Sequence, residues 1–523
     1  MDFIEMLILA VQMFRADPSE KTSTDLLSLL QANEGLHTTK HVFARENQLA
    51  AVNANSNGFY ALKEIIVNAM EACLEYILEL VQLGTEPSSP IEAFAGVTEA
   101  LRARPVNHGW AFKDDAGIPI PRVAFKKDED GRWIVSIQDP WGMPEPVFAS
   151  QYMTIHEGKK FQRDHTWGRY GQGAASIFKH SEFRVTVTRH RANPDIVLLG
   201  VVFPEATAYS KQNRQYFWHT GTDGKPLAIP ADRLPDAEFG TAVYVIGLDS
   251  RGWSGASDVF KWLNAAFIAT PIGIAKTEDW NSTAEDFRAK NQRIRPMFGP
   301  ARSDRTAGMY EFINLDPFSL DGYDGEVCVQ VAYATPGQGG SATGRTGGER
   351  NIFFTVSGLT QGQESDELIN EAGLIHLKGD LIVRVELDGL KGAVSRLLRP
   401  DREGLYENGA DTEELIEGVI AALKSSPELR RLEQKLAADD ILQNIPLDDI
   451  WDEDDGAEEN SDEGTEPGEA SLQPAVAEEH KRAGTAAIDR ARQSRGRTPR
   501  PAKPLVHPMT ERSEEHTSEL QSR

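Results

Sequence analysis

Residues 58–83, which read GFYALKEIIVNAMEACLEYILELVQL, decide the architecture of the first half of this chain. Apolar residues recur along this stretch every three or four positions, which is the period of an α-helix that buries one face. These apolar positions are Phe59, Leu62, Ile66, Ala69, Cys73, Ile77 and Leu80. We therefore expect one long amphipathic helix, against which the strands of the chain can pack.

Three polar residues lie on the opposite face of this expected helix. With Glu64 set at zero and 100° of rotation per residue, Asn68 falls at about 40° and Glu71 at about 340°. A solvent-exposed helix face would give the same pattern, and Glu75 and Glu79 on the same side fit that simpler interpretation. The three residues are a candidate site only in combination with other motifs.

Alternating apolar residues predict strands after a turn-rich stretch. The expected strands of the first half are residues 133–139, 183–188, 195–203 and 241–248. Residues 84–125 are rich in turn formers, which predicts a loop or an inserted subdomain. A long helix beside several strands gives the first 250 residues the pattern of an α+β sandwich.

The second half of the chain has a similar mixed pattern. The helical stretch ASDVFKWLNAAFIA precedes expected strands at residues 326–334, 351–359 and 381–387. A helical tail is expected from about residue 412 to 442. Beyond it the chain is first acidic and then basic with few aliphatic residues, which predicts disorder.

These patterns divide the chain into six parts. They are an N-terminal helical segment (1–57), a first α+β domain (58–250, with an insertion at 84–125), a second α+β domain (251–411), a helical segment (412–445), a charged tail (446–511) and a terminal stretch (512–523). Within the last part, residues 512–522 (RSEEHTSELQS) resemble the translation of a sequencing adapter. On that resemblance we expect this stretch to carry no biology and the natural C terminus to be unknown, with an ordinary polar tail as the alternative.

Composition limits the class of protein. With 523 residues, 40% of them hydrophobic, the chain is long enough for about three domains with real cores. The formal net charge is −25, and nearly half of the acidic excess lies in residues 448–469. Cys73 and Cys328 both lie in apolar runs, which suits buried thiols in a reducing compartment better than a disulfide. The chain has no apolar run of about 18 residues and no basic N-terminal signal, so we expect a cytoplasmic protein without a membrane span.

A second motif follows the expected strand 133–139. Asp139 lies at its end and leads into the turn Pro-Trp-Gly-Met-Pro, which contains Gly142 and Met143. A carboxylate there can accept a hydrogen bond from an exocyclic amine, and Gly142 lets a flat ring approach the backbone. An ordinary Asp-Pro turn would read the same way.

A third motif is glycine-rich. Gly168, Gly171 and Gly173 precede a helical stretch, where backbone N–H groups can approach a phosphate. No Lys-Ser/Thr pair follows Gly173, so this is not a Walker loop, and the preceding segment is too polar for a Rossmann site.

The order of these motifs resembles the four-box pattern of the GHKL ATPases, the family of gyrase B, the heat-shock chaperone, MutL and topoisomerase VI B. The fourth box is Gly240-Thr241 at the start of a strand. The resemblance spans roughly residues 58–248 and is closest in kind to topoisomerase VI B. It implies an ATP-binding Bergerat sandwich, followed by a transducer-like or middle-like α+β domain.

The resemblance also implies a role for each matching residue. Glu64 matches the general base, Asn68 the Mg²⁺ ligand, and Asp139 the carboxylate that reads the adenine amine. Further contacts to ATP are implied for Glu71, Gly142, Met143, Gly168, Gly171, Gly173 and Thr241. The cofactors implied are ATP and Mg²⁺.

The sequence departs from the family pattern in the long gap between Glu71 and Asp139, which makes 84–125 an expected insertion, and at two further places. Glu71 stands where the family usually has Asp, and the turn after Asp139 is one residue shorter than usual. Alignment on the Gly-Met pair alone would put Gln138 at the aspartate position, but apolar residues two and four positions before Asp139 favour Asp139.

In this family the second domain donates a basic side chain to the γ-phosphate and so couples ATP to closure of a dimer. Lys391, Arg399 and Arg402 are the candidates, with a solvated basic helix as the alternative. We therefore expect an ATP-gated, nucleotide-dependent homodimer that acts as a clamp on DNA with a separate nuclease or topoisomerase A-like subunit, and no membrane partner. A chaperone-like ATPase with protein clients and a non-catalytic ATP-binding module are the alternatives.

Overall fold

The computed structural model describes most of the chain between Phe3 and Asn444. The described residues are 3–33, 37–41, 58–83, 87–153, 177–205, 215–248, 253–278, 280, 282–286, 293–294, 296–298, 308–335, 345–346, 350–390, 394–399, 404–406 and 409–444. The charged tail and the terminal stretch expected after residue 445 lie outside the described residues.

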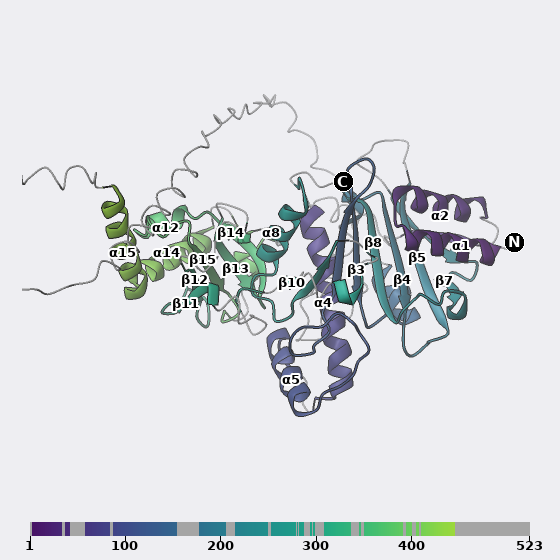
Figure 1. The fold of residues 1–523 in the computed structure, drawn as a ribbon, viewed down its shortest axis with the longest axis horizontal. Helices are drawn as coiled ribbons and strands as arrows, with labels where there is room; N and C mark the ends of the chain where they lie inside the picture. The colour runs from purple at the N-terminus through teal and green to yellow at the C-terminus, as the bar shows by residue number, and fades with distance from the viewer. Residues whose placement is uncertain are drawn as a thin grey trace, which may run out of the picture. The chain divides into compact units, whose positions relative to one another are not determined.

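The first half of the described chain contains a ten-stranded sheet in the order β1-β6-β5-β4-β8-β3-β2-β9-β10, with β7 paired to β5 (Figure 1). Its strands are β1 (His37–His41), β2 (Arg122–Lys127), β3 (Trp133–Asp139), β4 (Phe183–Arg189), β5 (Ile196–Glu205), β6 (Gln215–Gly221), β7 (Leu227–Pro230), β8 (Gly240–Leu248), β9 (Ile274–Thr277) and β10 (Arg293–Ile294). The antiparallel register of β3 with β8 places Asp139 opposite Thr241. The four strands predicted in this half are therefore confirmed.

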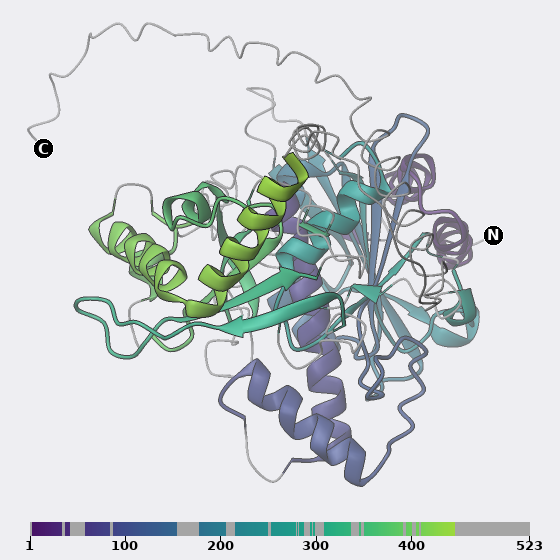
Figure 2. The same ribbon diagram turned by 60° about the vertical axis from the view of Figure 1, so that its left-hand side comes forward.

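Helices cover both faces of this sheet (Figure 1). On one face lie α4 (Gly58–Val81) and α5 (Pro90–Ala103), and on the other lie α1 (Phe3–Ala16) and α2 (Glu20–Ala32). The turned view separates α4 clearly from α1 and α2 (Figure 2). The sheet thus lies between two helical layers, and the predicted long helix is confirmed as α4.

Alternation along the strands explains how one sheet serves two cores. Val185 and Val187 of β4 pack against α1 and α2, whereas Val135 and Ile137 of β3 join the core beneath α4. Successive side chains of a strand point to opposite faces. Thr188, which follows Val187 in β4, therefore points toward the α4 face, where the Asp139 turn lies.

The stretch predicted to be a loop or a subdomain contains α5. Ser89 caps its first turn, because its hydroxyl accepts the Glu92 N–H, and Pro90 occupies the first helical position, where no N–H is needed. The buried residues Phe94, Val97 and Leu101 attach α5 to the core under α4. Of the two interpretations given for 84–125, an inserted subdomain suits this helix better than a loop.

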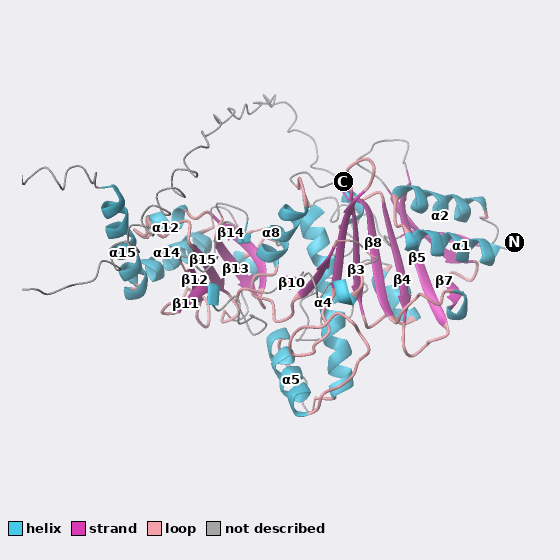
Figure 3. Ribbon diagram, viewed as in Figure 1, coloured by secondary structure: helices cyan, strands magenta, loops and turns pink. Residues whose placement is uncertain are grey.

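A second, five-stranded sheet has the order β11-β12-β15-β13-β14 (Figure 3). Its strands are β11 (Tyr310–Asn314), β12 (Cys328–Ala334), β13 (Ile352–Val356), β14 (Leu359–Glu364) and β15 (Leu381–Glu386). The helices of this half that the structure describes are α8 (Ala256–Ala266), α12 (Glu367–Glu371), α13 (Val394–Leu397), α14 (Ala410–Ser425) and α15 (Pro427–Asn444). The chain is therefore α+β with two mixed sheets, as predicted, and the three predicted strands of this half are confirmed.

Valines of β12 and β15 form the core of the second half together with Leu415 and Val419 of α14. The predicted helical tail is two helices, because Pro427 lacks the N–H that would continue α14. Cys73 is buried as predicted, but Cys328 is exposed. The prediction for Cys328 was wrong because β12 alternates, and Val329 and Val331 take the buried positions.

The first sheet also extends beyond the expected limits of the first domain. β1 belongs to the segment predicted to be helical, 1–57, and pairs with β6. At the other end, β9 and β10 lie after residue 250, and β9 pairs in parallel with β2. Strands from three of the expected parts therefore share one sheet.

Candidate functional site

The candidate site begins with the polar stripe of α4. Glu64 and Asn68 are partly exposed, as is Glu75 two turns further along. Glu71 differs, because it lies at the edge of the stripe and is only 3% exposed. The prediction that all three residues share a face opposite the core is therefore wrong for Glu71, since α4 is covered on more sides than its apolar period alone suggested.

Asp139 is the last residue of β3, and its carboxylate closes the turn that follows. Its Oδ1 atom accepts the N–H of Trp141 at 3.0 Å and that of Gly142 at 3.5 Å. The neighbouring Gln138 instead interacts with Ser136 and Arg122, through bonds of 3.3 and 3.4 Å. Of the two residues considered for this position, Asp139 is thus the one that the turn holds in place.

Burial raises the pKa of the Asp139 carboxyl to about 7. Backbone N–H donors from Trp141, Gly142 and Thr241 oppose this rise in pKa, and the nearby Glu75 carboxylate adds to it. Burial also raises the pKa of the Cys73 thiol, with a further contribution from the charge of Asp139. The two α4 residues Cys73 and Glu75 therefore lie within electrostatic reach of the Asp139 turn.

Two glycines allow the backbone to approach closely around this turn. Gly142 has φ 77°, and a Cβ atom there would collide with the carbonyl oxygen of Arg189. Gly240 has φ 126°, and a Cβ atom there would collide with the carbonyl oxygen of Asp139 itself. Side chains at either position would thus separate β4 or β8 from the end of β3.

Hydroxyl groups connect the turn to the two neighbouring strands. Thr188 Oγ1 accepts the N–H of Met143 at 2.7 Å and lies 3.0 Å from Thr241 Oγ1. Both threonines are buried. Thr241 therefore joins the site through Thr188 as well as through its pairing with Asp139.

Thr188 was missed by reasoning from the sequence. It lies at the end of FRVTVT, in which Thr186 and Thr188 alternate with buried valines. Polar residues at every second position of a buried strand are a signal that could have identified it.

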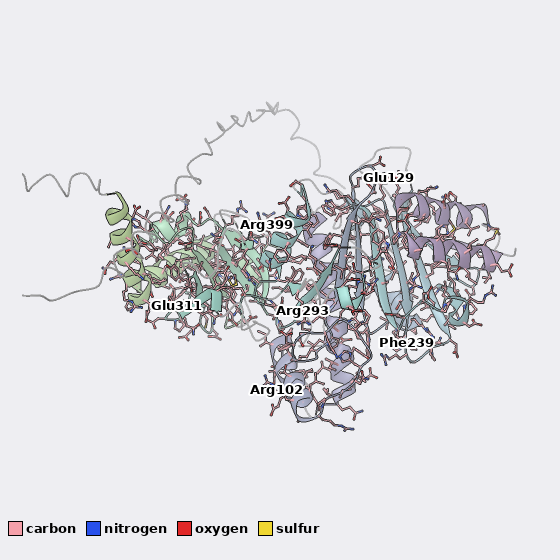
Figure 4. The ribbon with its side chains drawn as sticks, viewed as in Figure 1. Arg102, Glu129, Phe239, Arg293, Glu311 and Arg399 are labelled. Carbon is pink, nitrogen blue, oxygen red and sulfur yellow. The ribbon has the colours of Figure 1, made fainter. Side chains whose placement is uncertain are left out.

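An aromatic and cationic cluster borders the turn and was also missed. The Trp141 ring lies 5.9 Å from the Tyr76 ring and 5.7 Å from His190, measured between centroids. The Arg191 guanidinium lies 4.6 Å from the Tyr76 centroid, within cation–π range. Figure 4 labels Phe239, which also contacts Arg191, at this end of the first sheet, and Glu129 at the opposite end. No local sequence pattern predicts this cluster, because its members come from α4, the turn after β3 and the end of β4.

The remaining predicted contacts lie mostly outside the described residues. This applies to Gly168, Gly171 and Gly173, and to the basic candidates Lys391 and Arg402. Arg399 is described, and its N–H donates to Gly404 O at 3.0 Å in a turn that follows α13 (Figure 4). That turn packs on β14, because Gly404 approaches Gly362.

Asn68 is the metal ligand that the sequence resemblance implies. In the described parts of the chain, no group of three or more His, Cys, Asp or Glu residues could hold a metal ion. Mg²⁺ prefers oxygen ligands, and the Asn68 side chain could offer one. The described helices also include none long and apolar enough to cross a membrane.

Comparison with known proteins adds no relative. No family model matches this chain, and no curated protein matches its sequence. Function is therefore inferred from the geometry of the site and from the order of the sequence motifs.

Proposed function

We propose that this protein binds and hydrolyses ATP with Mg²⁺ as a GHKL-type ATPase. The surroundings of Asp139 carry the proposal, because a buried carboxylate is held by two backbone N–H groups beside the helix that bears Glu64 and Asn68. Adenine has an exocyclic amine where guanine has a carbonyl oxygen. A carboxylate acceptor therefore favours adenine over guanine. Burial strengthens this discrimination, because a buried polar group that lacks its partner cannot form a hydrogen bond to water instead.

The polar stripe of α4 supplies the other roles in this proposal. Glu64 accepts a proton from the attacking water, which makes it the general base. Asn68, one helical turn further on, gives an oxygen ligand to Mg²⁺. When bound, Mg²⁺ offsets the negative charge of the triphosphate. Glu71 is buried and would act by positioning Asn68 rather than by contact with water.

The biological setting is the wider part of the proposal. A basic side chain of the second half (Lys391, Arg399 or Arg402) contacts the γ-phosphate, and the chain closes as a homodimer around DNA. A separate nuclease or topoisomerase A-like subunit carries out any cleavage. Stimulation of turnover by DNA supports this setting, whereas stimulation by unfolded protein supports a chaperone-like ATPase.

Nucleotide titration by calorimetry tests the proposal. The wild type should bind ATP with Mg²⁺ and prefer it to GTP, and Asp139→Ala should abolish that binding. Asp388→Ala is the matched control, since Asp388 is another carboxylate that accepts a backbone N–H, from Ser357, and has a pKa raised by burial. Full ATP affinity in a folded Asp139→Ala variant would contradict the proposal, because Asp139 would then not take part in binding.

Sedimentation tests the clamp separately. A non-hydrolysable ATP analogue should produce a dimer that ADP does not produce. Identical profiles with the two nucleotides would contradict the clamp and leave ATP binding untouched.

A further inference from the structure

The turn between β13 and β14 and the start of β14 are hydrogen-bonded at three points, to the segment around α8 and to α4. Gly358 O accepts the N–H of Ala269 at 3.2 Å, and Thr360 Oγ1 donates to Ala265 O at 2.5 Å. The third bond runs from Lys63 Nζ to Thr360 O and measures 2.8 Å. Leu359, between these residues, packs in the core beneath α4. The start of β14 is thus anchored both on the segment around α8 and on α4.

The Lys63 bond differs from the other two in its chemistry. Its side chain is only 3% exposed, so an ammonium group is held where water has little access. Burying such a charge has a free-energy cost, and an apolar residue of similar length could pack there without that cost. What the lysine adds is direction, because a charge-assisted hydrogen bond selects one carbonyl group of β14.

Lys63 also adjoins Glu64 in sequence. Consecutive side chains of a helix are rotated by 100°, so Lys63 points toward β14 while Glu64 belongs to the partly exposed stripe. The first turns of α4 therefore connect the carbonyl of Thr360 to the helix backbone that carries Glu64.

We propose that Lys63 is a positioning residue that couples the second sheet to Glu64, an inference that rests on the proposed function. Its bond to Thr360 O orients the first turns of α4 against β14, so a shift of the second sheet changes the direction of the Glu64 carboxylate. Hydrolysis, but not nucleotide binding, then depends on where β14 lies. Lys63 itself touches neither nucleotide nor water in this role.

The test replaces Lys63 in the full-length chain by Met, which keeps the length and removes the donor. We expect kcat to fall about 10-fold while KM changes by less than about 2-fold, because only the base is displaced. Amide hydrogen exchange in residues 359–364 should become faster, which is a readout independent of activity. Lys63→Arg should restore both, since it keeps a cationic donor.

Two controls separate coupling from loss of structure. Lys435→Met removes an exposed lysine from α15 and should change neither measurement. Thr360→Val removes the hydroxyl bond to Ala265 and leaves the carbonyl to Lys63, so exchange should rise while kcat stays within about 2-fold of the wild type. Lys63→Gln, one bond too short to reach, serves if the Met variant does not fold.

The two proposals fail in different ways. If the wild type hydrolyses ATP and Lys63→Met has the same kcat, the coupling is wrong and the proposed function stands. A drop in kcat equally large in Thr360→Val would also overturn it, because general loosening of the junction would then explain the effect. If the wild type hydrolyses no ATP, the proposed function is wrong and the coupling falls with it.

Discussion

Asp139 in the first half and Arg384 in the second are both buried ionisable residues, but their partners differ in kind. Arg384 Nη1 donates to Gln330 at 2.8 Å, and its Nη2 lies 3.0 Å from the Glu386 carboxylate. Asp139 is held by backbone N–H groups, with the Glu75 carboxylate near enough to raise its pKa further. The second sheet thus neutralises its buried charge internally, whereas the first keeps a carboxyl whose pKa is about 7. Perturbed groups of the second kind are typical of functional sites.

The largest effect should come from the polar stripe of α4. Glu64→Ala should lower ATP turnover about 10²- to 10⁴-fold, the usual cost of removing a positioned base, with nucleotide affinity unchanged. Glu79→Ala is the matched control, because Glu79 lies on the same face and is exposed. Steady-state phosphate release measures turnover, and calorimetry measures nucleotide affinity. Wild-type turnover in Glu64→Ala would contradict the role of general base and favour the interpretation of the stripe as a solvated helix face.

In the second half, the largest effect should be on stability and not on the site. Phe354→Ala removes a fully buried ring from the core beneath α14 and should cost about 3–5 kcal/mol of unfolding free energy. Urea denaturation measures this loss, and ATP affinity at low temperature should stay near that of the wild type. A large loss of ATP affinity in the folded variant would contradict this prediction, because the core of the second half would then also determine nucleotide binding.

The pH dependence of Asp139 sharpens the same contrast. Its pKa is raised on folding from its ordinary value near 3.8 to about 7, so the folded state binds the proton more tightly and stability falls as the pH rises through this window. Between pH 5 and pH 8 the wild type should therefore lose roughly 2–3 kcal/mol relative to Asp139→Asn, which cannot ionise. Thermal or urea unfolding at the two pH values tests this, and parallel curves for the two proteins would contradict the raised pKa.

The same titration predicts how binding responds to pH. An amine donor favours the ionised carboxylate, so ATP affinity should rise as the pH increases through about 7 and then level off. Asp139→Asn should show no such rise. Calorimetry in buffers of different ionisation enthalpy would detect the proton released on binding, and its absence would argue against an amine at Asp139.

The smallest effect should come from Thr188. Thr188→Val leaves the N–H of Met143 without its acceptor. The free energy of unfolding should fall by about 1 kcal/mol, the lower end for a polar group that loses its partner in a partly buried position. Thr186→Val, two residues earlier on the same strand, is the control, because its hydroxyl contacts Tyr152 instead. Nucleotide affinity should fall slightly in the first variant only.

Local periodicity was sufficient to predict the α+β class, the long helix α4 and the strands β3, β4, β5, β8, β12, β13 and β15. In each of these elements the apolar residues recur with the period of the helix or strand that forms, so a local pattern was enough. Even α5 carried a readable signal in Ser89-Pro90 and the spacing of Phe94, Val97 and Leu101. The sequence also singled out Glu64, Asn68 and Asp139, since motif order requires no coordinates.

Contacts between distant segments could not be obtained in this way. Three features depend on residues that are far apart in the sequence, so no local pattern predicts them. They are the burial of Glu71, the hydrogen bonds through the Thr188 hydroxyl and the bond from Lys63 to Thr360. The raised pKa of Asp139 belongs to the same class, because desolvation depends on everything packed around the carboxyl. Periodicity records which face of an element is buried, but only the folded chain brings particular partners to that face.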